Sequence, residues 1–177
     1  MREAIFTHPK PRSAWKTRCD RRFPGRLFAL LSAFLLLFAH VPACAQEKTP
    51  PEAYEGSMLK RLGLPYAEAY VLVTAGGVSY VPIPLLGDRE YTLRQGEGVE
   101  NTIHVTDTGV YMAHATCENQ DCVNQGEVTL QNRDFRILGS LIICLPNQVE
   151  VALYTFEEME ALLNDAFASS GAREAEE

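Results

Sequence analysis

The chain has 177 residues, of which 46% are hydrophobic, enough for one folded domain of ordinary size with a leader or tail. Its net charge is divided unevenly, because the segment up to Cys44 carries eight basic residues and two acidic ones. The other 8 basic and 21 acidic residues give the rest of the chain a net charge of −13. A domain with this charge repels polyphosphates, which argues against nucleic-acid binding.

Residues 1–44 have the composition of a bacterial export signal. A basic stretch ending at Arg26 precedes an apolar run over 27–39, and small residues follow at 43–45. The apolar run is about thirteen residues long, whereas a membrane-spanning helix needs about twenty. We therefore expect a leader that places the acidic part outside the cytoplasmic membrane.

Cys44 is a candidate for lipidation. The sequence Val41-Pro42-Ala43-Cys44 resembles a lipobox, in which the cysteine is diacylated and becomes the first residue of the mature protein. Cleavage after Ala45 and an uncleaved N-terminal anchor remain as alternatives. The lipid or the N-terminal helix would attach the protein to the membrane or cell envelope.

Residues 45–66 are predicted to be a flexible tether with one short helix. The stretch 46–56 is rich in Pro and Glu and lacks hydrophobic periodicity. The helix is expected over 57–64, before Pro65, because Met58, Leu59 and Leu62 would share a face.

Residues 67–168 are predicted to form a mainly β domain, either a small antiparallel sandwich or a barrel-like fold, closed by one C-terminal amphipathic helix. Glycine at 76 and 77, Asp107-Thr108-Gly109 and Pro146-Asn147 indicate turns. Pro82 and Pro84 remove hydrogen-bond donors and place their strand at an edge. The expected strands cover residues 69–74, 78–86, 90–94, 101–106, 110–116, 126–130, 135–137, 141–145 and 149–155.

The helix is expected to begin at a capping box formed by Thr155 and Glu158. Its apolar stripe favours a lid on the sheet over a partner-binding surface, and the acidic tail 169–177 is predicted to be disordered. The stripe consists of Phe156, Met159, Leu162, Leu163, Ala166 and Phe167.

From about Tyr70 to Tyr154 the chain resembles the NusG domain II family of exported bacterial proteins. The resemblance rests on the turn at Gly76-Gly77, the hairpin 101–111, and the segments 122–126 and 143–147. It implies an N-terminal membrane-targeting segment and no established activity. The family is similar to an insert in some NusG transcription factors, but this chain is too short to hold the polymerase-binding domain of NusG.

The three cysteines of this region allow three hypotheses. In an oxidising envelope, a structural disulfide is favoured, with Cys117–Cys122 the first choice and Cys122–Cys144 the second. A redox-active pair is less favoured, because Glu118 and Asp121 would raise the pKa of a nearby thiol. A zinc site would require Cys117, Cys122 and Cys144 together with His114.

The histidines weaken the zinc hypothesis. If Asp107-Thr108 is a two-residue hairpin loop, His104 and His114 are expected on opposite faces of the sheet. Both could not then join one site.

No catalytic motif is present: the sequence lacks G-x-S-x-G, H-E-x-x-H and a Walker loop. We therefore expect an extracytoplasmic accessory or binding domain that is not an enzyme, has no cofactor, and acts with a protein partner in the envelope. The alternative is a thiol-redox or metal-binding component of an envelope electron-transfer system.

Overall fold

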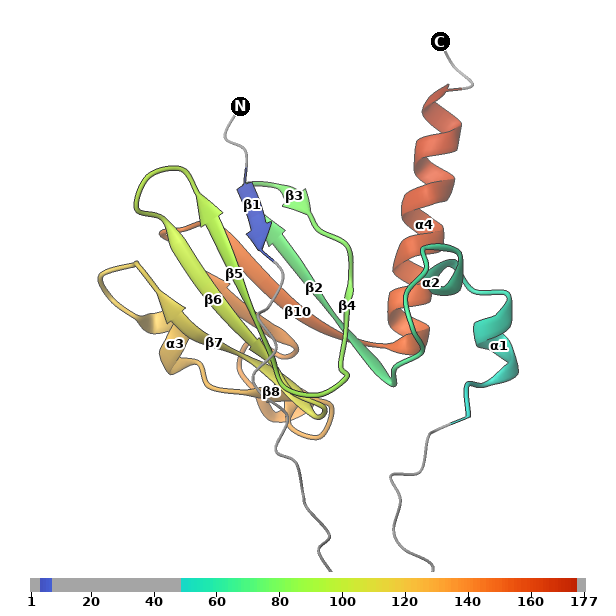
Figure 1. Cartoon of the computed structure of the whole chain (residues 1–177), viewed down its shortest axis with the longest axis horizontal. Coiled ribbons are helices and arrows are strands. Elements are labelled where there is room, and N and C mark those ends of the chain that lie inside the picture. The colour runs from blue at the N-terminus through green and yellow to red at the C-terminus, as the bar shows by residue number, and fades with distance from the viewer. Residues whose placement is uncertain (1–3, 8–48, 175–177) are drawn as a thin grey trace, which may run out of the picture. The chain divides into compact units, whose positions relative to one another are not determined.

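The computed structural model describes residues 4–7 and 49–174, with side-chain environments for 49–169. Two antiparallel sheets pack face to face, which confirms the mainly β sandwich (Figure 1). The strands are β1 (Ala4–Thr7), β2 (Ala69–Ala75), β3 (Val78–Ser79), β4 (Ile83–Pro84), β5 (Arg89–Gln95), β6 (Glu100–Val105), β7 (Gly109–Ala115), β8 (Val128–Thr129), β9 (Leu141–Cys144) and β10 (Val149–Thr155).

One sheet has the order β1-β5-β6-β7-β8, and the other has the order β3-β2-β10-β9, with β4 also paired to β2. In the second sheet, β2 comes first along the chain and β10 comes last. These two strands pair along their whole length, from Ala69 opposite Thr155 to Ala75 opposite Val149. This long-range pair closes the domain.

The main core lies between the sheets and follows the alternation of the strands. In β6, Ile103 and Val105 are buried, while Thr102 and His104, which alternate with them, are only partly covered. Strands β2 and β10 contribute Val71, Val73 and other apolar side chains from the opposite sheet. In β6 the buried and partly covered residues thus follow the period of two that is typical of a strand.

The predicted strand over 78–86 is divided. Strands β3 and β4 pair separately with β2, and the chain between them runs through Pro82. Both lie at the edge of the sheet, as the two prolines predicted. The turn before β3 has positive φ at Gly76 (57°) and Gly77 (83°), which suits glycine.

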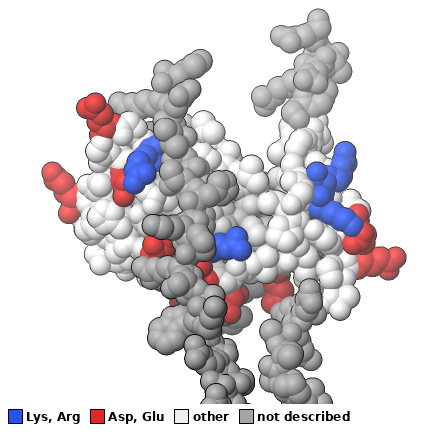
Figure 2. All heavy atoms as spheres, viewed as in Figure 1, with Lys and Arg blue, Asp and Glu red and all other residues white. Residues whose placement is uncertain are grey.

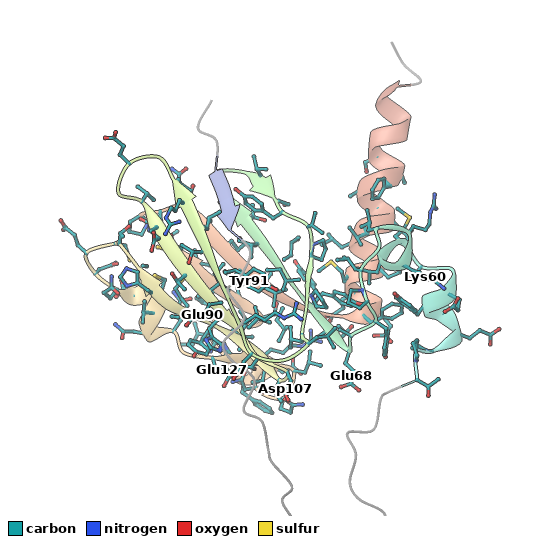
Figure 3. The ribbon with its side chains drawn as sticks, viewed as in Figure 1. Lys60, Glu68, Glu90, Tyr91, Asp107 and Glu127 are labelled. Atoms are coloured by element: carbon teal, nitrogen blue, oxygen red, sulfur yellow. The ribbon has the colours of Figure 1, made fainter. Side chains whose placement is uncertain are left out.

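Four α-helices accompany the sheets within the described part of the chain: α1 (Glu52–Glu55), α2 (Met58–Arg61), α3 (Asp121–Asn124) and α4 (Phe156–Glu174). The segment expected to be a flexible tether thus contains two helical turns. Ser57 caps α2 by accepting a hydrogen bond from the Lys60 backbone, and the Lys60 ammonium pairs with Glu55 of α1 (Figure 3). Tyr54 of α1 donates a hydrogen bond to the Leu64 carbonyl at 2.6 Å.

A second, smaller core joins these helices to the sheet. Tyr70 of β2, Leu59 of α2, and Phe156 and Met159 of α4 are all buried there. Glu160 of α4 accepts hydrogen bonds from the backbone N–H groups of Met58 and Leu59, so the start of α2 is tied to α4.

The predicted capping box is present: Glu158 accepts from the Thr155 N–H at 2.8 Å, and the Thr155 hydroxyl accepts from the Glu158 N–H at 3.2 Å. The helix covers the sheet only with its first turns, because Leu162 is 37% exposed and Phe167 49% exposed. It continues to Glu174, through part of the tail expected to be disordered.

The prediction of a strand over residues 135–137 is wrong. Residues Arg133–Phe135 form a 3-10 turn, and Phe135 and Ile137 are 90% and 104% exposed. The Arg136 guanidinium holds this loop by donating to the carbonyls of Gln125, Glu127, Gly139 and Leu141. The loop is therefore held by hydrogen bonds from one side chain to backbone carbonyls. A strand would instead need backbone hydrogen bonds to a neighbouring strand.

Candidate functional site

The structure brings Cys117, Cys122 and Cys144 together in one buried cluster, called the three-cysteine cluster below. Their Sγ atoms all lie within 4.8 Å of one another, and those of Cys117 and Cys122 are 3.5 Å apart. The residues are 5%, 1% and 1% exposed. They come from three places: the segment after β7, helix α3 and the end of β9.

The chain between β7 and α3 is folded back by Gln120. This residue has a left-handed backbone with φ of 54°, and its side-chain amide donates to the carbonyl of Ala115 at 2.8 Å and also to that of Cys117. The same nitrogen lies 3.9 Å from the Cys117 sulfur. The loop that we expected to bring Cys117 and Cys122 together therefore does so through a single glutamine.

Helix α3 is held against β9 by Gln125. The side-chain amide of Gln125 donates to the Ile143 carbonyl and accepts from the Ile143 N–H, both at 2.8 Å. A side chain thus takes the place of a neighbouring strand beside Ile143. The pairing places Cys122 of α3 next to Cys144 of β9.

Two asparagines surround the Cys144 sulfur. Asn101 of β6 is fully buried, and the Asn147 amide donates to its Oδ1 at 2.7 Å. The Asn101 side chain and the Asn147 backbone both hydrogen-bond to Cys144. Gln95 donates to the Asn147 carbonyl at 2.8 Å, which fixes the turn between β9 and β10.

The cysteines differ in acidity. Burial raises the pKa of Cys122 to about 12, and hydrogen bonds to Cys144 and Cys117 raise it further. Burial also acts to raise the pKa of Cys144, but hydrogen bonds from Asn101 and Asn147 outweigh it and lower that pKa. In a reduced cluster, Cys144 is therefore the favoured site for the thiolate.

His114 does not belong to this cluster. Among the described histidine, cysteine, aspartate and glutamate side chains, only the three cysteines gather here. A bulge in β7 sets Thr102 opposite His114 but Ile103 opposite Met112, so Ala113 is the extra residue. His114 is exposed on the outer face of the sheet.

The bulge also corrects the expected placement of the two histidines. Because one residue is inserted in β7, His114 and His104 fall on the same outer face rather than on opposite faces. His104 is stacked on Tyr111 at 4.8 Å and lies 3.2 Å from Asp88 and 3.5 Å from Glu90. It is a surface histidine with partners of its own.

Four polar residues of the site were not predicted from the sequence: Asn101, Gln120, Gln125 and Asn147. One signal was available: Asn101 occupies an inward position of β6, in alternation with Ile103 and Val105. A polar side chain in such a position needs a buried hydrogen-bond partner. The contacts of the two glutamines depend on a three-dimensional arrangement that sequence periodicity does not encode.

The surface charge is mixed where it can be seen. Figure 2 shows basic side chains in small separate groups, with acidic side chains distributed around them. At the β6–β7 hairpin, where Asp107 lies, the Thr106 hydroxyl is 3.4 Å from Glu127, the residue before β8 (Figure 3).

Cys44, the lipidation candidate, and the apolar run 27–39 lie outside the described residues. Within 4–7 and 49–174, no helix is long and apolar enough to cross a membrane.

The family model described as NusG domain II matches residues 31–155, which include the three-cysteine cluster and both sheets except β1. The chain belongs to the NusG domain II family. The resemblance expected from the hairpin and the cysteine segments is thereby confirmed. Nothing among the curated proteins matches this NusG domain II protein.

Solved structures of similar proteins come from several bacteria. A DUF1312 family protein from Ruminococcus gnavus is 32% identical, with 48% of this chain and 96% of that chain covered and a TM-score of 0.37. The Lin0431 protein from Listeria innocua is 21% identical, with 50% and 98% covered and a TM-score of 0.43. A DUF1312 family protein from Enterococcus faecalis is 15% identical, with 50% and 98% covered and a TM-score of 0.44.

Proposed function

We propose that this NusG domain II protein is an accessory or binding domain held at the outer side of the cytoplasmic membrane, rather than an enzyme. The observation that carries the proposal is the burial of all three thiols, of which the most exposed is Cys117 at 5%. A substrate needs access to a reactive group, and these sulfurs offer almost none. Their position inside the sandwich suits a role in holding the domain together.

The location rests on the leader. A basic stretch, an apolar run and small residues before Ala45 support export, and the lipobox-like Val41–Cys44 supports attachment through a diacylated Cys44. The net charge of −13 after Cys44 supports a protein partner rather than a nucleic acid.

Fractionation of cells that make the full chain tests this location. The wild-type chain is expected in the membrane fraction and should be degraded by a protease added to spheroplasts. Cys44→Ala should release the domain or leave it unprocessed, while Cys19→Ala, which changes the other leader cysteine, should leave membrane retention unchanged. Protection of the wild-type chain from external protease would overturn the proposed location.

The second candidate is a thiol-redox component, and one feature of the cluster favours it. Cys122 contacts both Cys117 and Cys144, so the two predicted disulfides share one sulfur and exclude each other. A Cys144 thiolate can attack Cys122 in a Cys117–Cys122 disulfide, forming a Cys122–Cys144 bond and releasing Cys117 as the thiolate. The exchange conserves electrons, and reduction of either disulfide needs two electrons and two protons from an external dithiol.

Titration in glutathione buffers separates the two candidates. A structural disulfide is expected to stay oxidised at the glutathione potential, whereas a redox component is expected to be reduced reversibly there. Reversible reduction of the wild-type chain near this potential would favour the redox candidate over a purely structural cluster.

A further inference from the structure

Going beyond the accessory role, we propose that the reduced three-cysteine cluster binds one soft monovalent metal ion, with Cu(I) as the ion that fits it. Three sulfurs from separate elements converge on one point, and no histidine nitrogen or carboxylate oxygen of the described residues joins them. The spacing of the sulfurs, their number and the groups that hydrogen-bond to them all suit such an ion.

The spacing is suited to a shared ion. Metal–thiolate bonds are about 2.3 Å long, so two sulfurs bound to one ion lie about 3.8 to 4.0 Å apart in tetrahedral or trigonal geometry. The closest pair in the cluster, Cys117 and Cys122, is 3.5 Å apart, and no pair exceeds 4.8 Å. Small side-chain rotations suffice to reach bonding geometry.

The donor set selects the ion. Mg²⁺ and Ca²⁺ require oxygen ligands, and the cluster contains only sulfur. Zinc takes four ligands, but His114 is exposed on the outer face and the cysteines are too buried to admit a water freely. Cu(I) is soft, prefers thiolates and needs no fourth ligand, which matches three buried sulfurs.

The hydrogen bonds around the sulfurs resemble those that support metal-bound thiolates. The Asn101 side chain and the Asn147 backbone donate to Cys144, and the Gln120 amide nitrogen lies 3.9 Å from the Cys117 sulfur. Such second-sphere donors orient the ligands and disperse their negative charge.

Charge dispersal is needed at this site. When Cu(I) displaces the three thiol protons, the cluster carries a net charge of −2 in a buried place. The amide donors of Asn101, Asn147 and Gln120 face that charge from three different segments. Loading also consumes all three thiols, so an occupied cluster cannot form a disulfide.

The test uses the full chain, purified in detergent, reduced and kept without oxygen. Cu(I) is titrated in competition with a chromogenic Cu(I) chelator, and one tightly bound ion per chain is expected. Mass spectrometry after alkylation in denaturant should show Cys117, Cys122 and Cys144 all modified in the reduced metal-free chain. The loaded chain, alkylated while folded and with excess chelator absent, should show all three mature-domain thiols protected longer than in the metal-free chain.

Variants locate the ligands. Cys117→Ser, Cys122→Ser and Cys144→Ser should each weaken Cu(I) binding by more than about 100-fold, beyond the range expected for second-sphere residues. Asn101→Ala should weaken it by about 10- to 100-fold. His114→Ala and Cys44→Ala are the matched controls and should leave the affinity unchanged.

Circular dichroism shows whether each variant is folded, and the wild-type titration does not depend on the variants. The proposal is overturned if the reduced wild-type chain binds no stoichiometric Cu(I), or if Cu(I) leaves the alkylation of the three thiols unchanged. It is also overturned if the folded variants in which one of the three cysteines is replaced by Ser bind Cu(I) as tightly as the wild type. Tighter binding of Zn(II) than of Cu(I), with loss in His114→Ala, would replace it by a four-ligand zinc site.

Discussion

The Gln125 side chain forms two hydrogen bonds with the backbone of Ile143, one from its amide nitrogen and one to its amide oxygen, each 2.8 Å long. This pair links the end of α3 directly to β9, and these two elements carry Cys122 and Cys144. The meeting of those two cysteines therefore depends on a residue that is not itself part of the cluster.

Replacing Gln125 with Ala should destabilise the domain by about 1 to 3 kcal/mol, because the backbone groups of Ile143 lose their partners. Alkylation of Cys122 in the folded protein should also become faster as α3 loosens. Denaturant unfolding and timed alkylation measure the two effects. Gln131→Ala, at an exposed position in the following loop, is the control and should change neither. Wild-type stability of the Gln125 variant would contradict the role given to this residue.

Oxidation of the metal-free chain should first join Cys117 to Cys122. Their sulfurs are 3.5 Å apart, so a small movement reaches the bond length of about 2.05 Å. Peptide mapping without reduction should find this pair, and Cys144→Ser should retain it while Cys122→Ser abolishes it. A predominant Cys122–Cys144 bond in the wild-type chain would show that the alternative pairing is preferred.

The ion pair between Arg133 and Glu158 should make stability depend on pH. Two nitrogens of Arg133 lie 2.6 and 2.8 Å from the Glu158 carboxylate, and these hydrogen bonds lower its pKa. A carboxyl whose pKa is lower in the folded state contributes stability above its unfolded pKa of about 4.3 and loses it as pH falls through the folded pKa.

Glu158→Gln should therefore lower the unfolding midpoint at pH 7 and have a smaller effect at pH 3, where the wild-type carboxyl is becoming protonated. Urea unfolding at the two pH values measures the difference. Glu157→Gln, at the neighbouring exposed position, is the control. An equal effect of Glu158→Gln at both pH values would mean that the charge of the carboxylate is not responsible.

Much of the fold could be predicted because the strands repeat a simple pattern. The Val- and Ile-rich composition of β2, β6 and β10, bounded by turn residues, marked these segments as strands. The capping box at Thr155 marked the start of α4 for a similarly local reason.

The features that were missed arise from longer-range contacts. The apolar residues at 135 and 137 suggested a strand, but the Arg136 guanidinium captures the carbonyls around them and leaves both side chains exposed. The bulge at Ala113 places His114 on the outer face of the sheet, together with His104. The local sequence does not indicate that β7 contains this inserted residue. Pairing among the three cysteines was proposed from the sequence. The short distances between their sulfurs, however, depend on hydrogen bonds from the Gln120 and Gln125 side chains to the backbone of other segments.

The two ends of the apolar stripe on α4 should differ sharply in their contribution to stability. Met159 is fully buried against Leu59, Tyr70 and Phe156, whereas Leu162 is 37% exposed. Met159→Ala should cost about 2 to 5 kcal/mol, because it removes buried atoms and leaves a cavity. Leu162→Ala should change stability by about 0.5 kcal/mol or less, as is usual for substitutions near the surface.

Denaturant unfolding of the two variants measures this contrast within one helix. If the costs of the two substitutions were equal, α4 would have to cover the sheet along more of its length than its first turns, as the sequence pattern first suggested. A large loss in Met159→Ala alone would assign the stabilising role of α4 to the small core around Tyr70. That core ties the segment before β2 to the end of β10, so both ends of the β domain depend on it.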